Sequence, residues 1–464
     1  MAHRKKITLL ICSLWLYAAA WPAISAESKA FQPIVKKILP NGLTLINQRD
    51  ESSEITVLYL FIRGGKKVEP WEKRGLAYLT SRLTIEIPDQ KKAQDLMSQA
   101  SQVSMSSRAD YSYIRIACLS ESLEDTLKTM SKIITDPLLS GIRIDYVKKT
   151  MESQKKREDD DSLLLAHEAH INAFLAGTGY GGSVLGSEES RRNIRKRDVE
   201  DFFKAYYRGS NMILTVCSNL DEKRVLTICS DHFAEFPDGV PPPIKNSSPP
   251  VENERDIFIE KEGKQAVVSF GFPLPSLTKR HFALAYSLET LLGKGIGSRL
   301  WPLRAEEKLA YNFGARSTQL KEGGVIEVFL ETDNTKREEA LKALEKTIDR
   351  LLEQGVTEEE LRTTKVQSQA SFLRANETKE TRAFNLGLFE VQGLGFEFLN
   401  EFFQEIEGIT VEDMNFYIQK TLDPEKRVQV VVGSKNEETE KNKPLPLVQT
   451  ESSTSRPSLR KCIS

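Results

Sequence analysis

The feature that most constrains the fold of this chain is a repetition of its own pattern. Val199-Glu200-Asp201-Phe202 opens a predicted helix, and a turn then leads into an apolar strand from Met212 to Val216. Val411-Glu412-Asp413-Met414 opens a second predicted helix, and a turn connects it to an apolar strand from Val428 to Val432. The two helix openings lie 212 residues apart (411 − 199). Matching segments at one offset indicate that a single structural unit occurs twice along the chain.

A second pair of segments repeats at nearly the same offset. Each contains an apolar stripe with the spacing of one helix face. The stripes are Leu123, Leu127, Met130 and Ile134, and Leu341, Leu344, Ile348 and Leu351. Each half also alternates strand-length apolar runs with short helices. We therefore expect an α+β fold made of two homologous α/β domains, each a mostly antiparallel sheet with helices packed on one side.

Proline marks the boundary between the halves. The segment 237–252 carries Pro241-Pro242-Pro243 and Pro249-Pro250. Proline lacks the backbone donor and restricts its neighbour, so such a segment builds neither helix nor sheet. We predict an extended, semi-rigid linker over 237–252, between separate N-terminal and C-terminal domains at 27–236 and 253–433.

The two ends of the chain differ in composition from the rest. Arg4-Lys5-Lys6 and the apolar stretch from Ile7 to Ala20 precede the small residues of Ala23-Ile24-Ser25-Ala26, which is the order of a cleavable signal peptide. We therefore predict a signal peptide over residues 1–26 and export to a periplasm or out of the cell, without stable membrane insertion after cleavage. A short uncleaved anchor is the alternative. Residues 434–464 have scarcely any apolar pattern, and we expect a disordered tail there.

Charge and cysteine content exclude two classes of protein. The formal net charge is −1, and removal of the three signal-peptide cations makes the exported chain about −4 (−1 − 3). This balance lacks the basic excess of a nucleic-acid-binding protein. The exported chain keeps Cys118, Cys217, Cys229 and Cys462, too few for a disulfide scaffold. Cys118 and Cys217 end apolar runs, which favours buried thiols, and a Cys217–Cys229 disulfide remains open.

One helix of the first half has an unusual set of polar residues. An apolar run from Ile55 to Ile62 leads through a short loop to Gly75-Leu76-Ala77-Tyr78-Leu79-Thr80-Ser81-Arg82. Residues four apart share a helix face, so Tyr78 and Arg82 point the same way. A protonated phenol is a poor metal ligand, a serine is no base at neutral pH, and an arginine is a permanent cation. An ordinary amphipathic helix and a lost metal site both predict that no zinc binds here.

This order of segments resembles the start of the insulinase/pitrilysin family of zinc peptidases, whose helix reads Gly-Leu-Ala-His-x-x-Glu-His. The resemblance extends over about residues 33–435. It places Tyr78 and Arg82 at the two histidines, Ser81 at the catalytic glutamate, and Gln154 at the third ligand, a glutamate in the family. A catalytic zinc site needs three ligands and an open position for water. The resemblance therefore implies a degenerate site that holds no metal, and a chain with no cofactor of its own.

A segment of the second half resembles the part of the family that faces the zinc site across a closed chamber. There an arginine and a tyrosine seven residues apart hold the substrate and stabilise the oxyanion. Arg304 and Tyr311 match both residue types and the spacing. A guanidinium and a phenol can each donate a hydrogen bond to a carbonyl oxygen that gains charge. Lys308 replaces the family's usual glycine, and a surface arginine with a core tyrosine is the structural alternative.

His167-Glu168-Ala169-His170 offers a rival metal site, because two imidazoles three residues apart can share a helix face. The spacing is not that of His-Glu-x-x-His, and no further histidine is near in the sequence. In the resembling family this helix is structural. We therefore favour a structural role for both histidines and assign no metal ligand.

Together these features imply the non-catalytic subunit of an exported heterodimeric zinc peptidase. Such a subunit binds extended peptide substrates by strand addition at a sheet edge. It supplies Arg304 and Tyr311 to a zinc-bearing paralogous partner, and alone it is an inactive pseudo-peptidase. The alternative is a peptide- or protein-binding scaffold without any role in proteolysis. A self-sufficient protease that uses His167 and His170 is a third hypothesis.

Overall fold

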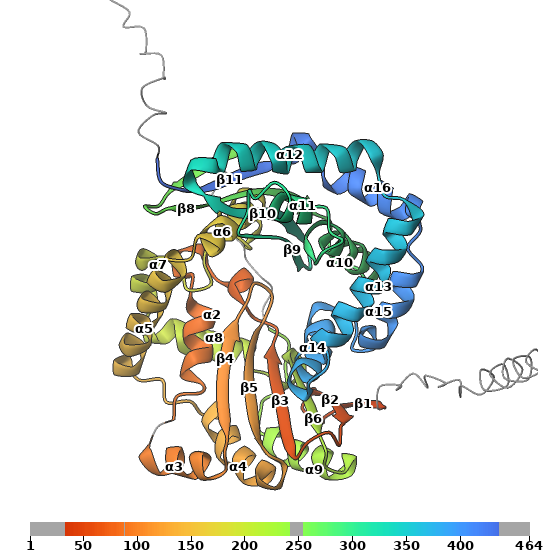
Figure 1. The fold of residues 1–464 in the computed structure, drawn as a ribbon. Helices are drawn as coiled ribbons and strands as arrows, with labels where there is room; N and C mark the ends of the chain where they lie inside the picture. The colour runs from red at the N-terminus through yellow and green to blue at the C-terminus, as the bar shows by residue number, and fades with distance from the viewer. Residues whose placement is uncertain (1–32, 88, 242–253, 436–464) are drawn as a thin grey trace, which may run out of the picture.

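The described part of the protein forms two sheets with helices around them (Figure 1). The structure, a computed structural model, describes residues 33–87, 89–241 and 254–435. The predicted signal peptide, most of the predicted linker and nearly all of the predicted tail lie outside these residues. None of the helices within these ranges combines the length and hydropathy needed to cross a membrane.

The N-terminal half, coloured red to yellow-green in Figure 1, contains the six-stranded sheet, in the order β1-β2-β6-β3-β5-β4. Its helices and strands are β1 (Ile34–Ile38), β2 (Thr44–Arg49), β3 (Ile55–Ile62), α2 (Leu76–Leu83), α3 (Gln90–Ser98), β4 (Gln102–Ser107), β5 (Ser112–Leu119), α4 (Leu123–Thr135), α5 (Gly141–Asp159), α6 (Ser162–Leu175), α7 (Glu188–Asn193), α8 (Lys196–Tyr206), β6 (Met212–Ser218) and α9 (Glu222–Phe233).

The C-terminal half, coloured green to blue, contains the five-stranded sheet, in the order β7-β11-β8-β10-β9. Its helices and strands are β7 (Asp256–Glu260), β8 (Gln265–Leu274), α10 (Lys279–Gly293), α11 (Trp301–Ala305), β9 (Asn312–Leu320), β10 (Gly323–Asp333), α12 (Arg337–Gln354), α13 (Glu358–Ala375), α14 (Lys379–Gln392), α15 (Phe398–Glu407), α16 (Val411–Thr421) and β11 (Val428–Gly433).

The two sheets have the same topology once the extra edge strand β1 is set aside. In the first sheet β6 runs parallel to β2 and antiparallel to β3, and β5 joins β3 to the edge strand β4. In the second, β11 runs parallel to β7 and antiparallel to β8, and β10 joins β8 to the edge strand β9. The predicted α+β duplication with mostly antiparallel sheets is therefore confirmed.

The repeated helices lie close to where the sequence places them. Both predicted apolar stripes are buried, on α4 and on α12. The helix α16 begins at Val411 as predicted. The predicted start of the first helix of this pair was wrong by three residues, because α8 begins at Lys196 and not at Val199. The Asp198 carboxylate accepts the backbone N–H of Arg195 at 2.7 Å and caps the helix earlier.

The halves exchange one helix each. α14 comes from the C-terminal half but packs on β3 and β6 of the N-terminal sheet, and α6 packs on β8, β10 and β11 of the C-terminal sheet. The alternation of β3 explains why both faces of its sheet are buried. Leu58, Leu60 and Ile62 face the helices of their own half, whereas Val57, Tyr59 and Phe61 belong to the same core cluster as α14. Besides the helices of its own half, each sheet thus carries a helix of the other half on its second face.

Each exchanged helix approaches its sheet closely at a point where a glycine faces an aromatic ring, and these points are equivalent in the two halves. The ninth residue of α6 is His170, whose ring lies so close to Gly271 of β8 that a side chain there would overlap it. The ninth residue of α14 is Gly387, and a side chain there would overlap the Phe61 ring of β3. The same close approach is therefore built in both halves, with the glycine on the strand in one and on the helix in the other.

The three cysteines within the described residues are free and buried: Cys118, Cys217 and Cys229. The preference for buried thiols over bridges at Cys118 and Cys217 is confirmed. The disulfide that the sequence left open between Cys217 and Cys229 does not form, and burial raises the pKa of both thiols to about 12. Cys462 lies outside the described residues.

Candidate degenerate peptidase site

The helix α2 begins on a buried carboxylate. Gly75 precedes it with a φ of 98°, a left-handed conformation that suits glycine. The Glu69 carboxylate accepts the backbone N–H groups of Gly75 at 3.0 Å and Ala77 at 2.6 Å. It thus satisfies donors that the first turn of a helix leaves free. Burial raises the pKa of Glu69 to about 7, against the opposing effect of these hydrogen bonds and of Arg74. This cap fixes the direction in which α2 presents its side chains.

Two of the four predicted positions are joined directly. Tyr78 of α2 donates its hydroxyl proton to the Gln154 Oε1 atom of α5 at 2.6 Å. The Gln154 amide in turn donates to the Glu158 carboxylate at 3.0 Å, one helical turn further on. Residues 76 positions apart therefore meet where the family resemblance places two metal ligands, but they meet through a hydrogen bond between neutral groups.

The other two positions have separate partners. Ser81 is fully buried and accepts a hydrogen bond from the Tyr207 hydroxyl at 3.0 Å. Arg82 forms an ion pair at 2.8 Å with Glu86, which follows the end of α2, and Arg143 of α5 approaches the same carboxylate at 3.3 Å. Neither Ser81 nor Arg82 is free to contact a group bound next to Tyr78 and Gln154.

This set of donors does not fit zinc. A neutral amide and a phenol bonded to each other are poor ligands, and a guanidinium beside them repels a dication. Ionising the phenol would improve it as a ligand, but burial raises the pKa of Tyr78. The residues present therefore make a closed polar contact in place of a metal centre.

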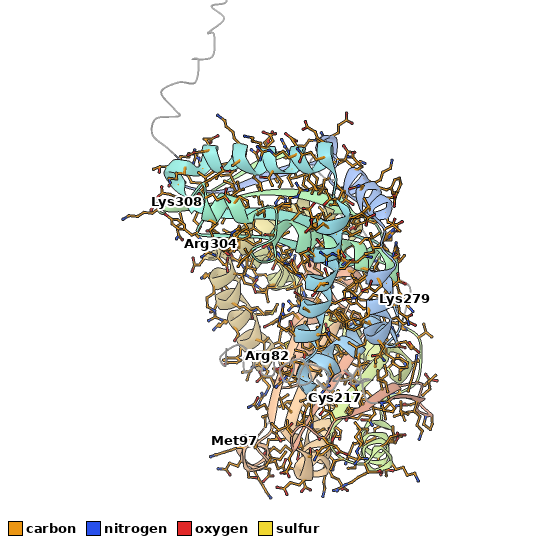
Figure 2. All side chains as sticks on the ribbon, turned by 45° about the vertical axis from the view of Figure 1, so that its right-hand side comes forward. Arg82, Met97, Cys217, Lys279, Arg304 and Lys308 are labelled. Atoms are coloured by element: carbon orange, nitrogen blue, oxygen red, sulfur yellow. The ribbon has the colours of Figure 1, made fainter. Side chains whose placement is uncertain are left out.

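Arg304 and Tyr311 lie on the other half of the molecule. Arg304 is exposed near the end of the short helix α11, and Tyr311 precedes β9 with 57% of its side chain exposed. Within the described residues neither side chain makes a hydrogen bond or an ion pair. Figure 2 places Arg304 and Lys308 on the upper half and Arg82 on the lower half. The chain does not bring its two predicted sets of site residues together.

Lys308, between these two residues, has a φ of 54°. This is the left-handed conformation that glycine adopts freely and other residues adopt at a cost. The backbone therefore keeps the geometry that a glycine would have, although the side chain has changed. The backbone from Arg304 to Tyr311 is therefore compatible with the prediction that these two side chains act together.

The two histidines of α6 hold that helix to the second sheet. The His170 Nε2 atom is 2.9 Å from Ser269 Oγ on β8, and the ring is fully buried. The His167 Nδ1 atom is 3.1 Å from the carboxylate of Glu327 on β10. Within the described ranges no group of three or more His, Cys, Asp or Glu side chains could hold a metal ion. The contacts of both histidines are those of a packed, structural helix.

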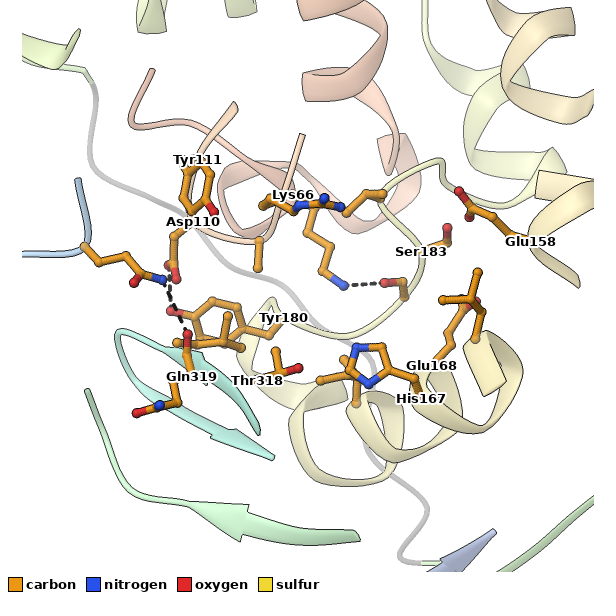
Figure 3. Close-up of a pocket in the computed structure, with 18 residues that line it drawn as sticks. Lys66, Asp110, Tyr111, Glu158, His167, Glu168, Tyr180, Ser183, Thr318 and Gln319 are labelled. Atoms are coloured by element: carbon orange, nitrogen blue, oxygen red, sulfur yellow. Dashed lines mark hydrogen bonds between the residues drawn. The ribbon is translucent and has the colours of Figure 1, made fainter. Parts of the chain in front are cut away.

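A cavity of about 440 Å³ lies between the two halves (Figure 3). The N-terminal half lines it with Lys66, the β4–β5 turn at 108–111, Glu158 and α6. The C-terminal half lines it with the end of β9 at 318–320 and with Gln392 of α14. Because Glu158 bonds Gln154, the cavity lies next to the Tyr78–Gln154 contact. The sequence did not predict this cavity, because its walls come from segments that meet only through the helix exchange. The one sequence signal for it was the Lys66-Lys67 pair after two glycines.

Comparisons with known proteins agree with this geometry. Residues 193–368 match the family model described as the Peptidase M16 inactive domain. An uncharacterized zinc protease of Rickettsia felis is 22% identical over 359 residues, 75% of this chain and 85% of that protein. The non-peptidase homolog YmxG of Helicobacter pylori is 22% identical over 370 residues, 78% of this chain and 85% of that protein.

Solved structures have the same fold. A protease from Helicobacter pylori superposes with a TM-score of 0.78 at 18% identity, over 87% of this chain and all of that chain. A peptidase M16 inactive domain from Pseudomonas fluorescens superposes with a TM-score of 0.79 at 18% identity, over 87% of this chain and 98% of that chain. The resemblance to the insulinase/pitrilysin peptidases, the M16 family, is thereby confirmed. The proteins that this chain resembles include ones described as inactive or as a non-peptidase homolog, and the donor set of this chain at Tyr78, Ser81, Arg82 and Gln154 likewise does not fit zinc.

Proposed function

We propose that this protein is the non-catalytic subunit of an exported heterodimeric zinc peptidase. One observation carries the proposal: Arg304 and Tyr311 are exposed and unengaged, whereas the side chains at the four degenerate zinc-site positions all have partners within the N-terminal half. Side chains able to stabilise an oxyanion are useful only where a reacting carbonyl is held. In this proposal a zinc-bearing paralogous subunit supplies that carbonyl, together with the metal and the base.

The sheet edges support the peptide-binding part of the proposal. The edge strand β4 pairs only with β5 in the described structure, so the backbone groups of its other edge are available to an added strand. The degenerate helix α2 packs beside β4. A peptide added to β4 would therefore run past the Tyr78–Gln154 contact, where it could be held but not cut.

A second candidate function is a peptide- or protein-binding scaffold without any role in proteolysis. The Helicobacter pylori relative that is named a non-peptidase homolog supports it. The two functions differ in the expected partner. Purification of the protein from its native host, with metal analysis of the material that accompanies it, should recover a zinc-bearing paralogue in the first case and no zinc protein in the second.

The decisive experiment measures the peptidase rate of the reconstituted pair. Tyr311→Phe and Arg304→Ala should leave association with the partner intact and lower turnover about a hundredfold to a thousandfold, the usual effect of losing one oxyanion donor. Tyr146→Phe and Arg362→Ala, which change an exposed tyrosine on α5 and an exposed arginine on α13, are the matched controls. Full activity of both Tyr311→Phe and Arg304→Ala in the pair would contradict the heterodimer function and favour the scaffold function.

A further inference from the structure

Two cations line the cavity between the halves without a direct ion pair among the described residues, although the Glu168 and Glu69 carboxylates lie near enough to Lys66 to favour its charged form. The Lys66 side chain lines it and is buried, with 7% of the residue exposed, and its ammonium donates to the Gly182 carbonyl at 2.5 Å. Arg108 lines the same cavity from the β4–β5 turn, and its exposed guanidinium makes no hydrogen bond or ion pair within the described residues. A buried ammonium normally has an anionic partner, because burial of an unpaired charge is costly.

The carboxylates of the cavity, in contrast, already have donors. Asp110 accepts the Tyr180 hydroxyl at 2.8 Å, Glu158 accepts the Gln154 amide at 3.0 Å, and Glu168 is paired with Lys155 at 2.9 Å. Each of these carboxylates thus has a donor within the protein, whereas in the described structure Arg108 has no acceptor and Lys66 has only a backbone carbonyl.

Further cations lie near the Asp110 end of the cavity. Lys321 follows β9 directly and donates its backbone N–H to Asp110 at 3.4 Å. Burial lowers the pKa of the Lys321 ammonium, the nearby Asp110 and Glu322 carboxylates oppose the shift, and the nearby cations of Arg63 and Lys67 add to it. Among the described residues neither Arg63 nor Lys321 forms a side-chain ion pair, and Lys67 is paired with Glu322 at 2.5 Å. The cations of Lys321, Arg63 and Lys67 thus share the Asp110 end of the cavity with the carboxylates of Asp110 and Glu322, and within the described ranges Lys66 and Arg108 are the lining cations without an ion pair of their own.

Part of the cavity wall is apolar. Leu164 and Ile171 of α6, Val184 of the loop after it and Leu320 of β9 all line it. Its volume of about 440 Å³ is within the range of small-ligand pockets, about 300–1,000 Å³. An apolar wall with a few cationic donors at one end suits a ligand that has an apolar body and one anionic end.

We propose that this cavity binds the C-terminal carboxylate of a peptide whose last side chain is apolar. Lys66 and Arg108 receive the carboxylate, and Leu164, Ile171, Val184 and Leu320 receive the side chain. The inference rests on the proposed function only in taking a peptide as the ligand. It requires neither zinc nor a partner subunit. In this arrangement the protein binds the free C-terminal end of a peptide.

The test is a calorimetric titration of the purified full chain with three probes. They are a hexapeptide ending in leucine with a free carboxylate, the same peptide as its C-terminal amide, and N-acetyl-leucine. We expect the free acid to bind about tenfold or more tighter than the amide, the effect of one charge-assisted hydrogen bond. Equal affinity of acid and amide would overturn the proposal. N-acetyl-leucine as tight as the peptide would show that the ligand is a small carboxylic acid and not a peptide end, and would overturn the peptide assignment.

Two variants locate the binding. Arg108→Gln changes an exposed side chain and should leave folding intact, and Lys66→Met keeps the length of the buried stem. Each should bring the affinity of the free acid close to that of the amide, whereas Arg362→Gln, on α13, should not change either. Unchanged discrimination in Arg108→Gln would contradict the proposal even where Lys66→Met proved unstable. Burial and Arg74 lower the pKa of Lys66 to about 8, so the affinity for the acid should fall as the pH rises above about 8. Failure of these measurements leaves the proposed heterodimer untouched, because its test is the rate of the reconstituted pair.

Discussion

Lys308 holds its backbone in the left-handed region, which glycine adopts more readily than other residues. An L-residue there has its Cβ atom close to the following carbonyl oxygen, at a cost on the order of 1–2 kcal/mol. The conformation persists because flanking contacts fix both ends of the turn. The Leu309 amide donates to the Leu303 carbonyl at 2.9 Å, and the Tyr311 amide donates to the Glu331 carbonyl at 2.8 Å.

Lys308→Gly should therefore stabilise the protein by up to about 1 kcal/mol, because relief of the strained conformation exceeds the extra entropy of glycine in the unfolded chain. Urea unfolding midpoints measure the change. Glu307→Gly is the matched control: its φ is not positive, so the same replacement should destabilise. Ala100, with a φ of 52°, offers a second test of the same sign. A Lys308→Gly variant as destabilised as Glu307→Gly would show that the strain is absent.

His170 should make stability depend on pH. Burial lowers the pKa of this imidazole to about 4, although the nearby Glu327 carboxylate opposes the shift and His167 and Arg316 add to it. An unfolded histidine titrates near 6.5, so the stability is complete above that pH and is lost as the pH falls toward 4. The loss is on the order of 2–3 kcal/mol.

Unfolding midpoints at about pH 7 and about pH 5 check this expectation. The wild-type protein should lose more stability between the two than His170→Gln, which cannot be protonated. His281→Gln, a replacement at a partly exposed histidine on α10, controls for the loss of any histidine. Equal pH dependence in wild type and His170→Gln would show that another group carries the effect.

At the scale of elements, the exchanged helices α6 and α14 decide which faces of the sheets are buried. α14 is held to the N-terminal sheet by polar contacts as well as by packing. The Thr215 hydroxyl donates to the Ala383 carbonyl at 2.7 Å, and the Lys379 ammonium donates to the carbonyls of Ser53 at 2.6 Å and Ile55 at 3.0 Å. α6 docks through His167 and His170. Each helix is therefore specific for the sheet on which it lies.

Gly387→Ala and Gly271→Ala should each destabilise the protein by about 1–3 kcal/mol or more, because the added methyl group meets a buried ring with no room to move. Gly141→Ala is the control. It opens α5, nothing lies within reach of its added carbon, and alanine there should be neutral or stabilising by up to about 1 kcal/mol. Thermal or urea unfolding measures all three.

A double-mutant cycle tests the pairing itself. The cost of Gly271→Ala should be smaller in a His170→Ala background, because the ring that it would strike is gone. Additive effects of the two changes would mean that the close approach of α6 to β8 is not what limits this position.

At the scale of the whole molecule, the exchange makes the halves interdependent. The largest core cluster contains residues of both sheets, such as Phe61 and Val57 from the first and Phe270 and Val268 from the second. A half on its own would expose the sheet face that the other half's helix covers. Two domains of the same topology thus share one continuous interior.

Cutting the chain between the halves should therefore not separate them. A protease recognition sequence inserted after Val240, which is 85% exposed, allows one clean cut. The two fragments should elute together on size exclusion in native buffer and separate in denaturant. Fragments that separate in native buffer and stay folded would mean that the exchanged helices contribute little to holding the halves together.

Much of this architecture was predictable because it depends on local pattern. The strand at Ile55–Ile62 and the stripes of α4 and α12 carry the spacing of their own secondary structure, and the duplication is the repetition of such patterns. The side chains of Tyr78, Ser81, Arg82 and Gln154 are poor zinc ligands in any fold, so this part of the argument needs no structure, and the absence of a bound metal remains a prediction. The roles proposed for Arg304 and Tyr311, the partner, the export and the domain boundaries remain predictions.

The sequence by itself determined what each segment can become: which runs form strands and helices, which polar groups cannot bind zinc, and where the unit repeats. Only the tertiary structure decided which segments meet. It brought Tyr78 to Gln154, placed α6 and α14 on the opposite sheets, and built a cavity from Lys66, Arg108 and the end of β9. The physical reason is that secondary structure depends on residues a few positions apart in the sequence. Burial of an apolar face is not directional, so the face must be covered, but its own residues do not determine which part of the chain covers it.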